Sequence, residues 1–158
     1  MVTPDLFKQV MSNWASGVTI VTTNAGREPY GLTVSSFASV SLDPLLVLVC
    51  LDNRLSGLQY FNDSKPFGIS ILSESQQHIS SLFAKKGTDR PADLYYTGKT
   101  GVPLLKGSLA VLECETVATY PGGDHTIYLG QVHSMEVLDA NRDARPLLYF
   151  RGGYQRMA

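Results

Sequence analysis

The stretch from Tyr30 to Asp43 constrains the fold most, because it combines a strand-like pattern with a dense set of hydroxyl groups. In a β-strand, successive side chains point to opposite faces, so the stretch divides into two sets of alternate residues. The set that we expect to lie in the core is Val34, Ser36, Ala38, Val40 and Leu42. The opposite set is a row of mostly short hydroxyl side chains, namely Thr33, Ser35, Phe37, Ser39 and Ser41.

Two interpretations of this hydroxyl row remain open from the residues alone. Closely spaced hydroxyls and backbone amides can donate hydrogen bonds to a phosphate or to the edge of a heteroaromatic ring. Serine and threonine are also ordinary on a strand of an antiparallel sheet that faces solvent. The row is therefore a candidate ligand-binding surface, and the rest of the chain must decide between the two interpretations.

Composition narrows the class of protein. A chain of 158 residues, 44% of them apolar and only 17% charged, favours a single domain over residues 1–158 with a substantial core. A net charge of −1 without a basic block argues against nucleic-acid binding. The longest apolar run, Leu45–Leu51, has the length of a strand and is too short to span a membrane.

Features of the N-terminus and of the cysteines predict a cytoplasmic protein. The first residues lack a basic region followed by an apolar one, so we expect no signal peptide. Cys50 and Cys114 lie far apart in apolar segments, which is typical of buried, reduced cysteines.

The chain predicts mainly short strands with a few helices. Thr3-Pro4-Asp5 begins a helix that Ser16-Gly17 ends, and two more helices are expected at Arg54–Asn62 and Glu74–Ala84. Residues 85–104 show no period and are expected to lack regular structure. The expected strands are Val18–Thr23, Tyr30–Leu42, Leu45–Leu51 (buried on both faces), Phe67–Leu72, Leu109–Thr119, Thr126–Val137 and Leu147–Phe150.

About seven short strands with two or three peripheral helices favour a closed antiparallel barrel, because closure removes exposed sheet edges.

Several kinds of site are excluded by their missing motifs. The chain has no GxGxxG after a strand and no GxxxxGK[ST], so neither a dinucleotide-binding fold nor a P-loop is indicated. It also has no GxSxG. His125 and His133 would be separated by roughly 26 Å along one strand, at about 3.3 Å per residue, so they cannot share an ion. His78 is interpreted as an ordinary helix residue, and we predict no metal site.

The segment Gly122-Gly123-Asp124-His125-Thr126 is a second candidate for chemistry. A glycine pair permits unusual dihedral angles and a close approach of the backbone to a ligand. A histidine at the start of the return strand can point its ring into the mouth of a pocket. An incidental hairpin turn is the alternative.

Three motifs, taken in order, resemble the short-chain flavin reductases, the small reductase partners of two-component flavin monooxygenases. They are Ser16–Thr23, Gly31–Phe37 with Ser39–Pro44, and Gly123–Ile127 with Gly130. The resemblance extends from about Leu6 to Tyr154. It implies a split, FMN-binding β-barrel of Greek-key type, and a homodimer with the flavin near the subunit interface.

The resemblance also implies site residues. Contacts to the isoalloxazine edge and ribityl chain are expected from Thr33, Val34, Ser35 and Ser36. Flavin-lining residues are expected at Cys50, Leu51, Asp52 and Asn53, a phosphate contact at Ser56, and a closing loop at Phe83, Ala84 and Lys85. His125 matches the histidine near the nicotinamide, and Tyr154 an aromatic residue at the pocket rim.

The implied activity is an NAD(P)H:flavin oxidoreductase that transfers hydride from NADH or NADPH to FMN or FAD and supplies reduced flavin to a partner oxygenase. Flavin performs the hydride chemistry and the protein positions it, which agrees with the lack of a nucleophile motif. The alternatives are a flavin-binding carrier or sensor without turnover, and a split-barrel relative that binds haem or a pyridoxal-type cofactor.

Overall fold

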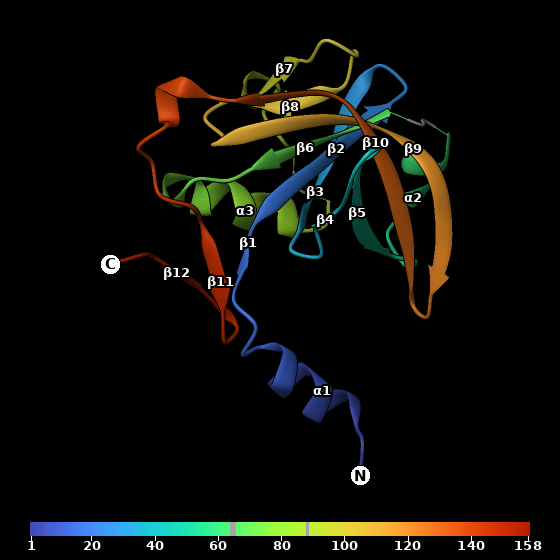
Figure 1. Cartoon of the computed structure of the whole chain (residues 1–158), viewed down its shortest axis with the longest axis vertical. Coiled ribbons are helices and arrows are strands. Elements are labelled where there is room, and N and C mark those ends of the chain that lie inside the picture. The colour runs from blue at the N-terminus through green and yellow to red at the C-terminus, as the bar shows by residue number, and fades with distance from the viewer. Residues whose placement is uncertain (64–65, 88) are drawn as a thin grey trace.

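The computed structural model describes residues 1–63, 66–87 and 89–158. Its main element is an antiparallel sheet of seven described strands in the order β3-β2-β6-β9-β10-β5-β4, which curls strongly (Figure 1). These strands are β2 (Thr19–Ala25), β3 (Glu28–Val34), β4 (Ala38–Leu42), β5 (Leu45–Asp52), β6 (Pro66–Ile71), β9 (Ala110–Gly122) and β10 (His125–Val137). The fold is therefore mainly β, as the sequence predicts.

Smaller elements surround this sheet. One small sheet has the order β1-β11-β12, and another pairs β7 with β8. Their strands are β1 (Ser16–Gly17), β7 (Tyr95–Thr97), β8 (Pro103–Leu105), β11 (Leu148–Phe150) and β12 (Gly153–Gln155). The helices are α1 (Pro4–Met11), α2 (Leu58–Asp63) and α3 (Gln77–Ala84), with 3₁₀ turns η1 (Glu74–Gln76), η2 (Ala92–Leu94) and η3 (Asp139–Asn141). In the described part of the chain, no helix has both the length and the apolar character needed to cross a membrane.

The predicted continuous strand from Tyr30 to Leu42 is wrong. The chain leaves β3 after Val34 and re-enters the sheet at Ala38, so that β3 and β4 form opposite edges of the main sheet. The reason is a contact with another strand, because the Ser36 side chain bonds the backbone of Cys50 on β5 and the chain crosses there between the two edges. No ladder of hydrogen bonds joins β3 to β4 among the described strands.

The prediction that β5 is buried on both faces is also wrong. Val47, Val49 and Leu51 are buried, whereas the alternate residues are only partly buried or exposed. The buried set joins a core cluster with residues of β2, β3 and β6 and with Phe61 of α2. The other face of β5 is thereby left to form the wall of a cavity.

Residues 85–104 contain structure that their composition conceals. They hold η2, β7 and the start of β8, and Tyr95 pairs with Leu105. Thr88, which belongs to this segment, lies outside the described residues. The small sheet forms because Tyr95, Leu104 and Leu105 are buried, while short polar turns connect them.

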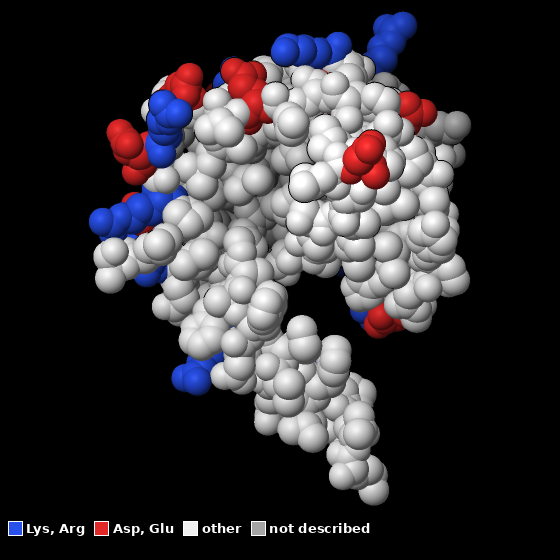
Figure 2. Space-filling model, viewed as in Figure 1, with Lys and Arg blue, Asp and Glu red and all other residues white. Residues whose placement is uncertain are grey.

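Helix α1 projects from the body and has no buried residue (Figure 1). The Thr3 hydroxyl caps it by accepting a hydrogen bond from the Leu6 amide at 3.2 Å. The helix ends at Met11, earlier than predicted, because the chain then turns to pair Ser16 with Tyr149. The side of α1 seen in Figure 2 carries few charged side chains.

Candidate functional site

A cavity of about 240 Å³ lies where the end of β3, the end of β5 and the start of β10 meet. The ladder between β10 and β5 places His125 opposite Asp52, so both side chains reach this cavity from neighbouring strands. Its lining is Leu32, Thr33, Val34, Ser35, Ser36, Cys50, Leu51, Asp52, Leu55 and His125. We call this space the strand-end pocket; it has apolar walls and a polar rim.

The hydroxyls of the predicted row are not equivalent. Ser36 Oγ donates to the carbonyl oxygen of Cys50 at 2.8 Å and accepts from the Cys50 amide at 3.1 Å. Thr33 Oγ1 donates to the carbonyl oxygen of Ser80 at 2.7 Å. A hydroxyl has one proton to donate, so these two hydroxyls are committed to the fold. Ser35, which is exposed, has no side-chain hydrogen bond to another described residue.

Charged groups occupy the rim of the strand-end pocket. The Asp52 carboxylate accepts hydrogen bonds from the Arg54 amide, Nε and Nη2 at 2.8, 3.0 and 2.7 Å, and these bonds hold the pKa of Asp52 well below its ordinary value. His125 Nδ1 lies 2.7 Å from Asp124 Oδ1, and this hydrogen bond lowers the pKa of Asp124. Because Nδ1 is engaged by Asp124, the Nε2 atom is the one left for a ligand.

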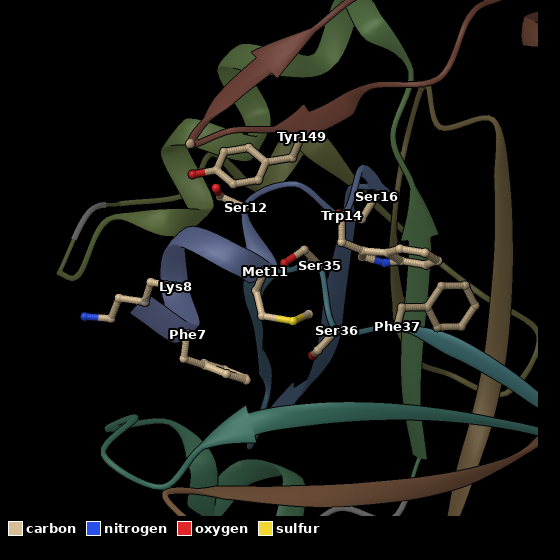
Figure 3. A pocket seen from close by; sticks show the side chains of 11 residues that line it. Phe7, Lys8, Met11, Ser12, Trp14, Ser16, Ser35, Ser36, Phe37 and Tyr149 are labelled. Carbon is tan, nitrogen blue, oxygen red and sulfur yellow. The ribbon is translucent and has the colours of Figure 1, made fainter. Parts of the chain in front are cut away.

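Two further cavities adjoin the strand-end pocket. One, of about 710 Å³, lies between α1 and the chain from Ser35 to Phe37, and Figure 3 shows Phe7, Met11 and Trp14 around it. The other, of about 270 Å³, is lined by Ser80, Ala84, Tyr149 and Tyr154 among others. Ser35 lines all three cavities, so it stands at their junction.

The structure brings together most of the predicted site residues. Thr33, Val34, Ser35, Ser36, Cys50, Leu51, Asp52 and His125 all line the strand-end pocket. Ala84 and Tyr154 line the 270 Å³ cavity, where the Tyr154 and Ser80 hydroxyls lie 2.7 Å apart.

The other predicted residues line none of these three cavities. Phe83 is buried in a core cluster that also contains Tyr95 and Leu105, and the Arg90 guanidinium lies 5.1 Å from its ring centre. Lys85 follows α3, and its carbonyl oxygen accepts a hydrogen bond from Arg90 at 2.9 Å. Ser56 is exposed in the loop before α2, and Asn53 bonds the hairpin tip that carries His125.

Sequence reasoning missed part of the lining. Leu32 and Leu55 give the strand-end pocket apolar walls, and Tyr149 borders both of the other cavities. The exposed apolar residues of α1 were a usable signal, because a short helix that carries Leu6, Phe7, Val10 and Met11 needs a partner surface. In the part of the chain that the structure describes, no group of three or more metal-ligating side chains occurs.

Residues 11–158 match the family model described as a flavin reductase like domain. The reductase component of 4-hydroxyphenylacetate 3-monooxygenase from Thermus thermophilus is 38% identical over 97% of this chain and 96% of that protein. An NADH-dependent flavin reductase from Rhodococcus sp is 36% identical over 99% of this chain and 88% of that protein.

Solved structures agree with the sequence matches. The flavin reductase PheA2 superposes with a TM-score of 0.90 at 34% identity, covering 99% of both chains. The NADH:FAD oxidoreductase SgcE6 of Streptomyces globisporus, in complex with NAD and FAD fragments, gives a TM-score of 0.91 at 34% identity, covering 100% of this chain and 96% of that one. The fold and these matches place the chain in the class of flavin reductases. This chain belongs to the flavin-reductase-like family.

Proposed function

We propose that this chain is an NADH:flavin oxidoreductase that reduces FMN or FAD and supplies the reduced flavin to the oxygenase component of a two-component monooxygenase. The observation that carries the proposal is the strand-end pocket, where the free Ser35 hydroxyl and His125 line one cavity with apolar walls. The names of relatives support both halves of it, since they include an NADH-dependent flavin reductase and several monooxygenase reductase components.

The residues present fit a flavin. Ligand pockets commonly measure about 300–1,000 Å³, so the strand-end pocket of about 240 Å³ is too small for a whole nucleotide. The neighbouring cavity of about 710 Å³ shares Ser35 and Ser36 with it and offers the remaining room. We place the ring at this junction, where a hydroxyl donor lies beside apolar walls.

When bound, flavin supplies the hydride-accepting ring. Ser35 would donate a hydrogen bond to the ring edge, and Leu32, Val34 and Leu51, which line the same cavity, would exclude water from one side of it. His125, whose Nδ1 is held by Asp124, would present Nε2 to the nicotinamide and help to orient it against the flavin. Cys50, Asp52 and Thr33 complete the wall, and no side chain acts as a nucleophile.

The proposal includes a closed split barrel formed by a single domain over residues 1–158. Support for closure comes from the two edges of the main sheet, since Ser36, which follows β3, bonds Cys50 on β5 next to the other edge. A cytoplasmic location is also proposed, because Cys50 and Cys114 are free thiols and a reducing compartment keeps thiols in this form.

A homodimer is the last part of the proposal, with α1 packed against the second copy. Phe7 is 63% exposed, Val10 61% and Trp14 73%, and an amphipathic helix without any buried residue is not stable by itself in water. Phe7 and Trp14 also border the 710 Å³ cavity (Figure 3), so the second copy would close the flavin site on that side.

The test is a titration of the apo-protein with FMN and FAD, followed by steady-state oxidation of NADH and NADPH with excess free flavin. We expect saturable flavin binding and multiple turnovers with NADH. Binding without turnover would make the protein a flavin carrier or sensor instead, and a visible spectrum without the two flavin bands after loading would point to another cofactor.

A further inference from the structure

Asn53 holds the tip of the β9–β10 hairpin, on which His125 lies. Its backbone N–H donates to the carbonyl oxygen of Asp124 at 3.0 Å, and its side-chain amide donates to the carbonyl oxygen of Gly123 at 3.4 Å. Its side-chain oxygen accepts a hydrogen bond from the Thr126 hydroxyl at 2.7 Å. One residue therefore bonds the chain on both sides of His125.

The location of these bonds explains why they matter. The β10–β5 ladder begins at the pair His125 and Asp52, so backbone pairing between these strands stops at the edge of the strand-end pocket. Beyond it the hairpin turns through Gly123, whose φ of +74° is a conformation that glycine adopts readily. Hairpin tips of this kind open easily unless they are tied down.

The bonds also set the orientation of the imidazole. Asp124 binds His125 Nδ1 through its carboxylate, while its own backbone carbonyl is bound by Asn53. The charged groups that face His125 are Asp124 on the same hairpin and Asp52 on β5, which is paired with Arg54. A shift of the tip would move His125 away from the pocket together with its carboxylate partner.

We propose that Asn53 is a positioning residue that acts through His125, and not a ligand of the flavin. This inference rests on the proposed function, because it uses the role given there to His125. Both polar ends of the Asn53 side chain are occupied within the protein, and the residue does not line the strand-end pocket. The resemblance had placed Asn53 among the flavin contacts.

The first test compares Asn53→Ala and Thr126→Val with Thr119→Val, an exposed threonine on the same hairpin without a side-chain bond to the described residues. Loss of the bonds should lower kcat/KM for NADH about fivefold to tenfold, while the flavin Kd stays within about twofold. Thr119→Val should match the unaltered protein. If Thr126→Val also matches it, or if only flavin affinity falls, the proposal is overturned.

A double-mutant cycle tests whether the effect passes through His125. In a His125→Ala background, Thr126→Val should cause no further loss of kcat/KM. An equal loss in both backgrounds would mean that Asn53 acts by another route, and would overturn the inference.

A measurement without activity separates this inference from the proposed function. Hydrogen exchange of residues 122–127 should quicken in Thr126→Val and Asn53→Ala and stay unchanged in Thr119→Val. Unchanged exchange in Thr126→Val and Asn53→Ala would show that the Asn53 bonds do not hold the hairpin tip, and would refute the inference. A protein that fails to oxidise NADH but passes this exchange test would instead refute the proposed function.

Discussion

The hydroxyl of Ser36 bonds both backbone groups of Cys50, donating to its carbonyl oxygen at 2.8 Å and accepting from its amide at 3.1 Å. A side chain here takes the place of a strand neighbour at the point where the chain crosses from β3 to β4. Ser36 therefore shapes the wall of the strand-end pocket, whereas the hydroxyl of Ser35, one residue earlier, has no such partner among the described residues.

This division of roles predicts different outcomes for two neighbouring serines. Ser35→Ala should weaken flavin binding about fivefold, the value of one hydrogen bond, with an unchanged melting temperature. Ser36→Ala should lower the melting temperature, because the backbone groups of Cys50 lose their partner. Flavin titration and thermal unfolding of both variants check this, and a reversed pattern would contradict it.

His125→Ala should lose NADH turnover far more than flavin affinity. We expect kcat/KM for NADH to fall about tenfold to a hundredfold, because the group that we propose to orient the nicotinamide is gone. The control is His133→Ala on the same strand, where the imidazole lies 3.5 Å from Glu115 and away from the strand-end pocket. Stopped-flow reduction of bound flavin measures the effect, and equal rates in the two variants would remove His125 from the site.

Glu113 should make the fold sensitive to acid. The residue is 4% exposed, and its carboxylate accepts hydrogen bonds from the Lys99 amide at 3.0 Å and from the Thr100 amide and hydroxyl at 2.6 Å each. Burial raises the pKa of Glu113, but these bonds outweigh it and leave the pKa below its ordinary value of 4.5. Such a group stabilises the protein above pH 4.5, and its contribution is lost as the pH falls through the lowered pKa.

Replacing Glu113 by glutamine tests this. Glu113→Gln should lower the free energy of unfolding by about 2 kcal/mol at pH 7, since the NH₂ group of the glutamine would face the N–H and O–H donors that now bind the carboxylate. It should also weaken the dependence of stability on pH below about 4.5. Glu115→Gln, a half-exposed neighbour on β9, is the control and should change neither quantity. Denaturant unfolding between pH 3 and 7 provides the measurement.

The exposed helix α1 predicts how the proposed dimer can be broken. Phe7→Asp places a charge on its apolar side and should shift the protein toward monomer, with weaker flavin binding because the 710 Å³ cavity loses its cover. Gln9→Asp adds the same charge to the same helix and should leave the dimer intact. Light scattering after gel filtration distinguishes the two, and a monomeric unaltered protein would contradict the premise.

Much of the fold could be predicted from local patterns. The hairpin of β9 and β10 follows from alternation on both sides of a glycine-containing turn, and α3 follows from its apolar stripe. Two features could not be predicted, because they depend on distant contacts. The break at Ser35 to Phe37 requires Cys50, and the burial of Glu113 on a strand requires the loop at Thr100.

The candidate site, like the fold, could be predicted from the sequence only where it does not depend on distant contacts. The cavity that holds Ser35, Asp52 and His125 joins segments that the sequence had already singled out. Nothing in the residue types showed that the Ser36 and Thr33 hydroxyls are used by the backbone, or that Asn53 bonds a turn 70 residues further along the chain. These hydrogen bonds depend on the three-dimensional arrangement of the chain, so the spacing of residues in the sequence does not predict them.

A single hydroxyl at the meeting point of three cavities would, in the proposed function, impose an order on binding. The Ser35 proton can serve one acceptor at a time, so a ring that claims it from the strand-end side denies it to a molecule arriving from either neighbouring space. Molecules that approach from different cavities would then compete for one hydroxyl group.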